Sequence, residues 1–326
     1  MGKISKNYRT SYKGWFEVKK VSIIIPTYNN LEYTKKCLEA IRKKTNKELY
    51  EIIVVDNASS DDTPLFLKSQ KDIVYILNKK NNNFSGACNQ GADIAKGEIF
   101  LFLNNDTEVH ENWLEPLIDI IKKEKMIGAV GSKLLFSDGK IQHAGIAVFD
   151  SKIPEHIYRL SPANKKYVNK RREFQAVTAA CIAIPKNIFD QVGGFDEYYR
   201  NGYEDMDLCF KIGKAGYKII YEPKSVVTHH ESISPGIHTY LIKNLDLLMS
   251  RWWKIKSDAN NYFEDDGFSR IQKLFLNVKY MAYEPQKYNT IPNKILKLRK
   301  IYLLIIKTNL FIKRQIGKFF NRKKDE

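Results

Sequence analysis

A carboxylate and two amide side chains directly follow an apolar run near position 100. The segment Phe102-Leu-Asn-Asn-Asp-Thr107 places Asn104, Asn105 and Asp106 immediately after a strand-like sequence. A carboxylate at such a position can hold Mg²⁺ or Mn²⁺ while a diphosphate supplies further oxygen atoms, because hard cations prefer oxygen ligands. This segment therefore predicts a site for a divalent cation and a diphosphate.

A second group of acidic residues lies in the segment Tyr203-Glu-Asp-Met-Asp-Leu208, at the expected start of a helix. One interpretation is structural, because an acidic first turn complements the partial positive charge of a helix N-terminus. The other is catalytic, because a carboxylate here could act as a general base that takes the proton from an incoming hydroxyl. The residues alone leave both interpretations open.

Two histidines follow in Thr228-His-His230, after a strand-like run. An imidazole at this position could add a metal ligand, because neutral histidine is a common ligand of divalent metals. A single histidine more often has a structural role, and the adjacent pair shifts the balance only slightly. The sequence leaves both roles open for His229.

These side chains need a scaffold, and the sequence predicts an α/β one. Short apolar runs alternate with helical patterns up to about Lys123, which predicts a parallel, doubly wound sheet. The expected strands are 21–25, 51–55, 73–77 and 98–103, and the expected helices are 31–44, one from Asp61, 84–96 and 111–123.

In parallel sheets of this kind, ligands bind beyond the carboxyl ends of the strands. Polar loops follow three of the expected strands: Pro26-Thr-Tyr-Asn29, Asp56-Asn57 and Asn104-Asn-Asp106. Each loop alone is explained by the preference of strand-to-helix turns for Asn, Asp and Ser. Three such loops along one edge of a sheet favour a binding site.

The pattern changes after Gly128. The dipeptide Asp138-Gly139 between two strand-like runs predicts a hairpin, and the polar stretch 151–172 predicts a mobile loop. A second βαβ-like piece is expected to follow. Its parts are a strand at 176–184, a helix from Pro185, a turn at Gly193-Gly194, a helix over 204–214 and a strand over 218–221.

The net charge of +17 is concentrated at the two ends of the chain, with +10 in residues 287–326 and +5 in residues 1–20. The nearly neutral middle and the lack of a nucleic-acid-binding motif predict no nucleic-acid partner. Four scattered cysteines without a CxxC pair favour a reducing compartment. No signal-peptide pattern and no apolar stretch of membrane-spanning length is visible, so a cytoplasmic location is expected.

Residues 294–322 combine apolar residues at helical spacing with basic residues on the other faces. Two interpretations fit this pattern: a helix packed on the rest of the chain, and an interfacial helix that binds anionic lipid. The second would make the protein peripheral on the inner face of the cell membrane.

Seven motifs occur in a characteristic order: Ile25-Pro-Thr-Tyr-Asn, Val54-Val-Asp-Asn-Ala-Ser, Asn89-Gln-Gly, Leu103-Asn-Asn-Asp-Thr, Val192-Gly-Gly-Phe-Asp-Glu, Glu204-Asp-Met-Asp-Leu and His229. Together they resemble glycosyltransferase family 2, which has the GT-A fold, a Rossmann-like, mostly parallel sheet flanked by helices. The resemblance covers about 21–234, and the Asn-Asn-Asp form is similar to the bacterial rhamnosyltransferase-like subgroup of cell-surface polysaccharide biosynthesis.

The resemblance implies a division of the chain. A basic segment 1–20 precedes a GT-A domain over 21–255, which consists of a nucleotide-sugar half (21–127) and an acceptor and catalytic half (128–255). A basic helical extension, 256–326, completes the chain.

The resemblance also implies roles for individual residues. Asp205 matches the family's catalytic base, with Glu204 beside it, and Asp106 and His229 match its metal ligands for Mn²⁺ or Mg²⁺. Asn104 stands where the family's Asp-x-Asp motif has its first Asp, which removes one negative charge from the metal site. The nucleotide and donor residues would be Pro26, Thr27, Tyr28, Asn29, Asp56, Asn83, Gly86, Asn89, Asn104 and Asn105, and the acceptor side would include Gly194, Phe195 and Asp196.

These roles imply an inverting, metal-dependent glycosyltransferase. Its donor would be a UDP- or dTDP-sugar, such as one of rhamnose or N-acetylhexosamine, and its acceptor a glycan or lipid-linked saccharide in surface polysaccharide assembly. The alternative is a non-catalytic GT-A-like module that binds a nucleotide-sugar or glycan, because Asn104 weakens the metal site.

Overall fold

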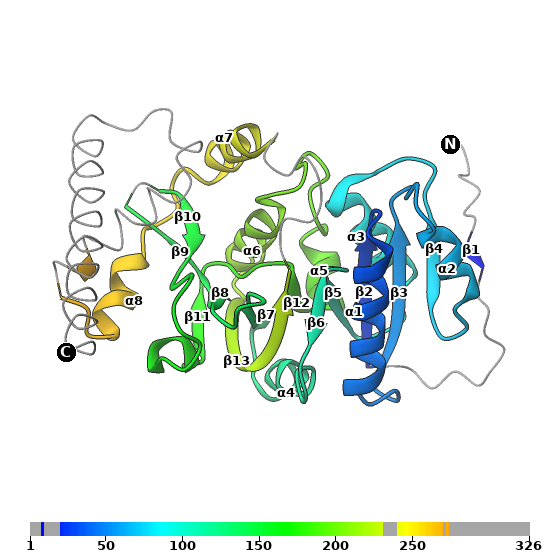
Figure 1. Ribbon diagram of the computed structural model, residues 1–326. Coiled ribbons are helices and arrows are strands. Elements are labelled where there is room, and N and C mark those ends of the chain that lie inside the picture. Colours follow the sequence, from blue (N-terminus) through cyan, green and yellow to red (C-terminus); the bar gives the residue numbers. More distant parts are fainter. Residues whose placement is uncertain (1–7, 10–19, 151, 231–239, 270–271, 274–326) are drawn as a thin grey trace, which may run out of the picture. The chain divides into compact units, whose positions relative to one another are not determined.

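The computed structural model describes residues 8–9, 20–150, 152–230, 240–269 and 272–273 (Figure 1). The chain divides into two compact units, and the boundary falls between Ser257 and Asp258. The predicted basic tail 294–322 and most of the basic segment 1–20 lie outside the described residues.

Four parallel strands form one half of the main sheet, in the order β4-β3-β2-β5. Every residue of β2 and β5 is buried, as the continuous apolar runs predict for a parallel sheet covered on both faces. The predicted α/β alternation is therefore confirmed in this half. The elements are β2 (Val21–Thr27), α1 (Leu31–Lys44), β3 (Tyr50–Asp56), α2 (Thr63–Ser69), β4 (Val74–Leu77), α3 (Asn83–Ile94) and β5 (Ile99–Leu103), and β1 (Tyr8–Arg9) pairs antiparallel with β4.

The other half of the sheet is mixed, with the order β5-β12-β7-β13-β11. β12 runs antiparallel to both of its neighbours, so the predicted second βαβ-like piece does not continue the parallel sheet. β13 runs parallel to β7 and continues to His229, well past the predicted end at Tyr221. The strands are β6 (Thr107–Val109), β7 (Ile127–Leu135), β8 (Ile141–His143), β11 (Arg172–Phe174), β12 (Cys181–Pro185) and β13 (Lys218–His229).

The connection between β7 and β8 confirms the predicted hairpin. The two strands pair antiparallel, and Gly139 in the turn has a φ of +78°, a conformation that glycine adopts without steric cost. The stretch 151–172, where a mobile loop was predicted, contains two short regular elements. It contains β10 (Pro154–His156), which pairs with β9 (Ile146–Val148), and a 3₁₀ helix, η1 (Lys166–Asn169).

Apolar anchors explain this order in the stretch 151–172. The side chains of Ile157, Tyr158 and Val168 are buried in spite of the charged residues around them. Burial of a few large apolar side chains can hold a polar stretch in place.

Helices α4, α5 and α6 pack against the mixed half of the sheet, and α6 starts with the acidic motif. Within the described residues, no helix is long and apolar enough to cross a membrane. All four cysteines are buried and free. The helices are α4 (Glu115–Lys123), α5 (Lys186–Gln191), α6 (Glu204–Lys214), α7 (Leu241–Trp252) and, in the second unit, α8 (Ala259–Asp265).

Candidate active site

The loops after β2 and β3 are joined around Asp56. The carboxylate of this residue, at the end of β3 and 1% exposed, accepts hydrogen bonds from the Ser59 backbone N–H and hydroxyl. Burial raises the pKa of Asp56, and the Ser59 hydrogen bonds partly oppose that shift. Ser59 also accepts a hydrogen bond of 2.7 Å from the backbone N–H of Asn29. The two loops therefore form one polar wall beyond the strand ends.

The loop after β5 is attached to the same wall. The Asn105 side-chain amide donates to the hydroxyls of Thr27 (3.1 Å) and Thr34 (3.0 Å). Tyr28, the residue after Thr27, is 39% exposed and leaves an aromatic ring at the surface, whereas Pro26 is buried in β2. The structure thus brings the three predicted loops together at one edge of the sheet, with Thr27 and Asn105 bonded to each other rather than directed to solvent.

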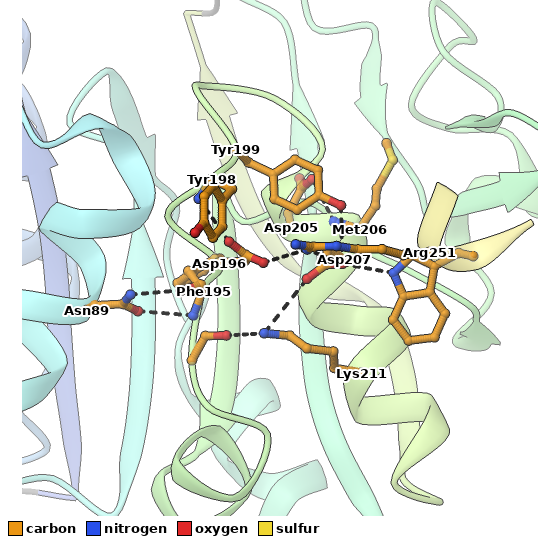
Figure 2. A network of polar contacts seen from close by, with 12 residues as sticks. Asn89, Phe195, Asp196, Tyr198, Tyr199, Asp205, Met206, Asp207, Lys211 and Arg251 are labelled. Carbon is orange, nitrogen blue, oxygen red and sulfur yellow. Dashed lines mark hydrogen bonds and ion pairs between the residues drawn. The ribbon is translucent and has the colours of Figure 1, made fainter. Parts of the chain in front are cut away.

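The predicted donor residues on α3 have different surroundings. Asn83, at the start of α3, has a φ of +59° and accepts a hydrogen bond of 3.0 Å at its backbone oxygen from Asn57. A Cβ atom at Gly86 would lie 3.0 Å from the Asn82 Cβ, so a side chain there would require Asn82 to shift by a few tenths of an ångström. Asn89 forms a double hydrogen bond with the backbone of Phe195, at 2.9 Å and 3.0 Å (Figure 2). Asn89 thus joins α3 to the predicted acceptor side.

The predicted metal residues meet at the far end of β13. His229 lies opposite Thr107 in the pairing of β13 with β6, which places its ring beside Asp106. The His229 Nε2 atom is 3.1 Å from Asp106 Oδ1 and 3.2 Å from the Asn104 amide nitrogen. Burial alone would raise the pKa of Asp106, but the hydrogen bond and charge of His229 hold it below its usual value.

The orientation of the His229 ring follows from Gln142. The Gln142 amide nitrogen donates to the His229 backbone oxygen at 3.1 Å, so its Oε1 atom is the one that faces the ring. Because Oε1 only accepts hydrogen bonds, the His229 Nδ1 atom, 2.6 Å away, carries the proton. Nε2 is the ring nitrogen that faces Asp106, where it can donate to the carboxylate or, once it has lost its proton, bind a metal ion.

These residues fit a divalent cation that is shared with a ligand. The described part of the chain has no group of three or more His, Cys, Asp or Glu side chains able to hold a metal ion. Asp106 and His229 would supply two ligands, and the oxygens of a diphosphate and water would have to supply the others. Asn104 contributes an amide where a carboxylate would give a third charged ligand.

The predicted base lies in the first turn of α6. The Asp205 carboxylate accepts hydrogen bonds from the backbone N–H of Ala179 (3.2 Å) and of Met206 (2.8 Å). Burial raises the pKa of Asp205. Burial and then the neighbouring charge of Asp205 raise the pKa of Glu204, whose carboxylate accepts a hydrogen bond from the Gly202 backbone N–H. Carboxyl groups with raised pKa values are typical of general bases.

The base and the metal residues are linked through one short segment. Asp205 binds the backbone N–H of Ala179, and the next residue, Ala180, accepts a hydrogen bond of 3.1 Å from the backbone N–H of Asn104. The position of the base relative to Asp106 therefore depends on only a few covalent and hydrogen bonds.

The predicted acceptor side is a loop whose residues contact β5, α6 and α7. Phe195 is buried against Phe102, with ring centroids 4.9 Å apart, and the Gly194 oxygen accepts a hydrogen bond of 2.5 Å from Lys211. Asp196 forms an ion pair of 2.5 Å with Arg251 (Figure 2).

Three of the residues around this loop were not predicted from the sequence: Lys211, Arg251 and Trp252. The two on α7 lie beyond every motif, and no local signal connects them to the loop. Charge complementarity to the acidic motif was the only clue to Lys211 and Arg251.

A half-parallel, half-mixed sheet with an acidic residue and a histidine beyond its strand ends defines a GT-A glycosyltransferase fold. The crystal structure titled GalNAc-T7 with UDP, GalNAc and Mn²⁺ has this architecture, with a TM-score of 0.59 and 19% identity over 84% of this chain and 59% of that one. A sequence model described as Glycosyl transferase family 2 matches residues 22–190. The chain belongs to glycosyl transferase family 2.

Curated relatives support the predicted subgroup. The chain is 31% identical to the O-antigen biosynthesis protein RfbC of Myxococcus xanthus over 66% of its own length and 18% of the relative. It is 23% identical to the N-acetylglucosaminyl-diphospho-decaprenol L-rhamnosyltransferase of Mycobacterium tuberculosis over 66% of this chain and 77% of that protein. It is 34% identical to the uncharacterised protein y4gI of Sinorhizobium fredii, of which it spans 25%. The chain thus spans a quarter or less of two of these three relatives.

Proposed function

We propose that the protein is an inverting, metal-dependent glycosyltransferase that moves a sugar from a nucleoside-diphosphate-sugar to a hydroxyl of a saccharide. One observation carries the proposal. Asp205, a carboxylate with a raised pKa, is attached at Ala179 to the segment that also holds Asn104, two residues before Asp106. A base at Asp205 and metal ligands at Asp106 and His229 would then belong to one connected site, which supports the proposal.

In a direct displacement at the anomeric carbon, different residues of the chain would take different roles. Asp205 takes the proton of the acceptor hydroxyl while that oxygen attacks the anomeric carbon and the bond to the diphosphate breaks. A divalent cation held by Asp106 and His229 would offset the negative charge that develops on the departing diphosphate. With one base and no carboxylate assigned as a nucleophile on the opposite face of the sugar, a single displacement inverts the anomeric centre.

The substrates follow from the same proposal. The donor is a UDP- or dTDP-sugar, and the rhamnosyltransferase named among the relatives favours rhamnose. The acceptor is a glycan or lipid-linked saccharide of a surface polysaccharide, as the O-antigen relative suggests. Such an acceptor would be reached at the inner face of the membrane, where the basic residues 294–322 would contact anionic lipid.

A non-catalytic binding module is the second candidate, and Asn104 favours it. Its amide nitrogen lies 3.2 Å from His229 Nε2, so an N–H group occupies a place where a carboxylate would strengthen cation binding. Such a module would bind the nucleotide-sugar without turnover.

Release of nucleoside diphosphate separates the two candidates. The full chain would be incubated with UDP- and dTDP-sugars and a saccharide acceptor, with Mn²⁺ or with a chelator, and the released diphosphate measured. An enzyme gives Mn²⁺-dependent release that Asp205→Asn removes and that Asp246→Asn, an exposed position on α7, preserves. Binding of the nucleotide-sugar without any release would establish the binding module.

A further inference from the structure

The loop between Phe195 and Tyr203 leads directly into α6, and its last part has an unusual backbone. Asn201 (φ +53°), Gly202 (φ +128°) and Tyr203 (φ +70°) are three consecutive residues with positive φ. Residues other than glycine adopt this region only when their surroundings hold them there. Tyr203 is the residue that precedes α6, so the conformation of this loop sets where the first turn of α6, with Glu204 and Asp205, begins.

Asn244 on α7 provides such support. Its side-chain nitrogen donates to the backbone oxygens of Arg200 (3.1 Å) and Gly202 (2.9 Å), and its Oδ1 atom accepts from the Arg200 N–H (3.3 Å). Asn244 is 3% exposed, so these hydrogen bonds are formed away from water. Both N–H groups and the oxygen of the amide are used on the loop backbone.

The close approach of α7 to the loop also explains why residue 202 is a glycine. A Cβ atom there would lie 3.2 Å from the Leu241 side chain, in addition to the strain of its positive φ. The N–H of Gly202 in turn donates to the Glu204 carboxylate. A short chain of hydrogen bonds thus leads from Asn244 through Gly202 to the acidic pair.

The C-terminal end of α7 holds the other end of the loop. Arg251 forms an ion pair of 2.5 Å with Asp196 and lies 3.5 Å from Asp207 (Figure 2). The Trp252 indole N–H donates to the Asp207 carboxylate at 2.8 Å, and the Tyr199 hydroxyl donates to the same oxygen at 3.2 Å. Asp207, 1% exposed, therefore ties the loop and α7 to α6.

We propose that α7 holds the loop 195–203 in the conformation that places Glu204 and Asp205 in the active site, and that Asn244 is the positioning residue through which it does so. The proposal rests on the proposed transferase function. It assigns a role in the reaction to a helix that lies outside the residues matched by the family model, 22–190. Nucleotide binding, by contrast, depends on the loops after β2, β3 and β5 and would not need α7.

The test compares Asn244→Ala and Asn244→Asp with Lys243→Ala in the full chain. The aspartate keeps the shape of the side chain and loses both donors, whereas Lys243 is the exposed neighbour on the same helix. We expect kcat to fall by about 10²-fold in both Asn244 variants, because small misplacements of a catalytic group cost that much. The KM for the donor and the Kd for UDP should stay within about twofold of wild type, and Lys243→Ala should behave as wild type.

A readout without turnover keeps the positioning role separate from the proposed function. Hydrogen exchange of peptides that cover residues 196–206 should become faster in the Asn244 variants, while exchange of peptides over β2 and β3 stays unchanged. If the wild-type chain transfers no sugar, the proposed function fails, and the exchange experiment still decides whether Asn244 orders the loop.

Two outcomes would overturn the positioning role. One is a kcat of the Asn244 variants within about threefold of wild type. The other is hydrogen exchange over residues 196–206 that stays as slow in the Asn244 variants as in wild type. Arg251→Gln and Arg251→Lys act at the other end of α7 and serve if the Asn244 variants do not fold. The lysine should retain kcat because it preserves the charge opposite Asp196, and the glutamine should not; equal kcat values in the two variants would contradict the proposal.

Discussion

The side chains of Asp106 and His229 lie 3.1 Å apart, although Asp106 follows β5 and His229 is the last residue of β13. They meet because β13 pairs antiparallel with β6, the short strand that begins directly after Asp106. The contact depends on a pairing of β-strands rather than on a local turn. A cation site built in this way requires both halves of the sheet to be folded.

The first prediction concerns this pair. In Asp106→Ala and His229→Ala, we expect Mn²⁺ to increase UDP affinity much less than in wild type, because each variant removes one of the two proposed protein ligands. Loss of a group that only supports a metal ligand costs about 10-fold to 100-fold in metal affinity, so loss of a ligand should cost at least about tenfold. Isothermal titration with UDP and dTDP, with and without Mn²⁺, measures it. An unchanged effect of Mn²⁺ would mean that the cation binds elsewhere.

A second prediction concerns the base. Asp205→Asn should lower kcat by about 10²-fold to 10⁴-fold, because it removes the proposed general base. Nucleotide binding should remain, since Asp205 is bonded to Ala179 and Met206 and not to the loops after β2 and β3. Steady-state transfer and titration with UDP are the measurements. If Asp205→Asn keeps about a third of wild-type turnover, Asp205 is not the general base.

The pH dependence of transfer should show the raised pKa values of the acidic pair. Burial favours the protonated, inactive form of Asp205, so kcat/KM should rise with pH in a range above that of an ordinary carboxyl group. Rate measurements from acidic to mildly alkaline pH give the profile. If kcat/KM already reaches its plateau near the ordinary carboxyl pKa, about 4, the pH dependence does not arise from Asp205.

Protein stability should respond to pH through Glu204. Its pKa is raised in the folded chain, so on increasing pH the unfolded chain ionises first and the folded state loses stability until Glu204 ionises as well. Glu204→Gln still accepts the Gly202 hydrogen bond and carries no charge. Its melting temperature should therefore exceed that of wild type at mildly alkaline pH and equal it at acidic pH. Thermal unfolding at both pH values tests the sign, and a gap that widens toward acidic pH would contradict it.

The basic tail gives a prediction about membranes. If residues 294–322 bind anionic lipid, the full chain should sediment with phosphatidylserine vesicles, and added salt should release it, because exposed charges are screened over about 8–10 Å. Replacement of the basic residues in 294–322 by glutamine should abolish sedimentation, and neutral vesicles are the control. Salt-insensitive sedimentation, or sedimentation that survives the replacement, would point to another mode of binding.

The parallel half of the fold could be predicted because its signal is local. The continuous apolar runs at 21–25 and 98–103 correspond to the observed strands β2 and β5, and the polar loops follow at the ends of these strands. The direction of β12 could not be predicted, because an apolar strand has the same composition whether its neighbours run with it or against it.

The candidate site shows the same division between local and long-range information. Glu204, Asp205 and Asp207 occur together in the sequence, but residues two apart on a helix point to different sides. Asp205 binds Ala179, whereas Asp207 binds Trp252. Which acid faces the site depends on the direction in which α6 packs, and that is decided by contacts with residues far away in the sequence.

The four buried thiols have a practical consequence for chemical labelling. Burial raises the pKa of Cys37, Cys181 and Cys209 to about 12, so these groups remain protonated at neutral pH and react slowly with maleimides. A cysteine introduced at the exposed Lys243 position would then be the reactive one among the described residues. A spin label or fluorophore attached there would report the distance of α7 from a second label during a catalytic cycle, without prior removal of the native cysteines.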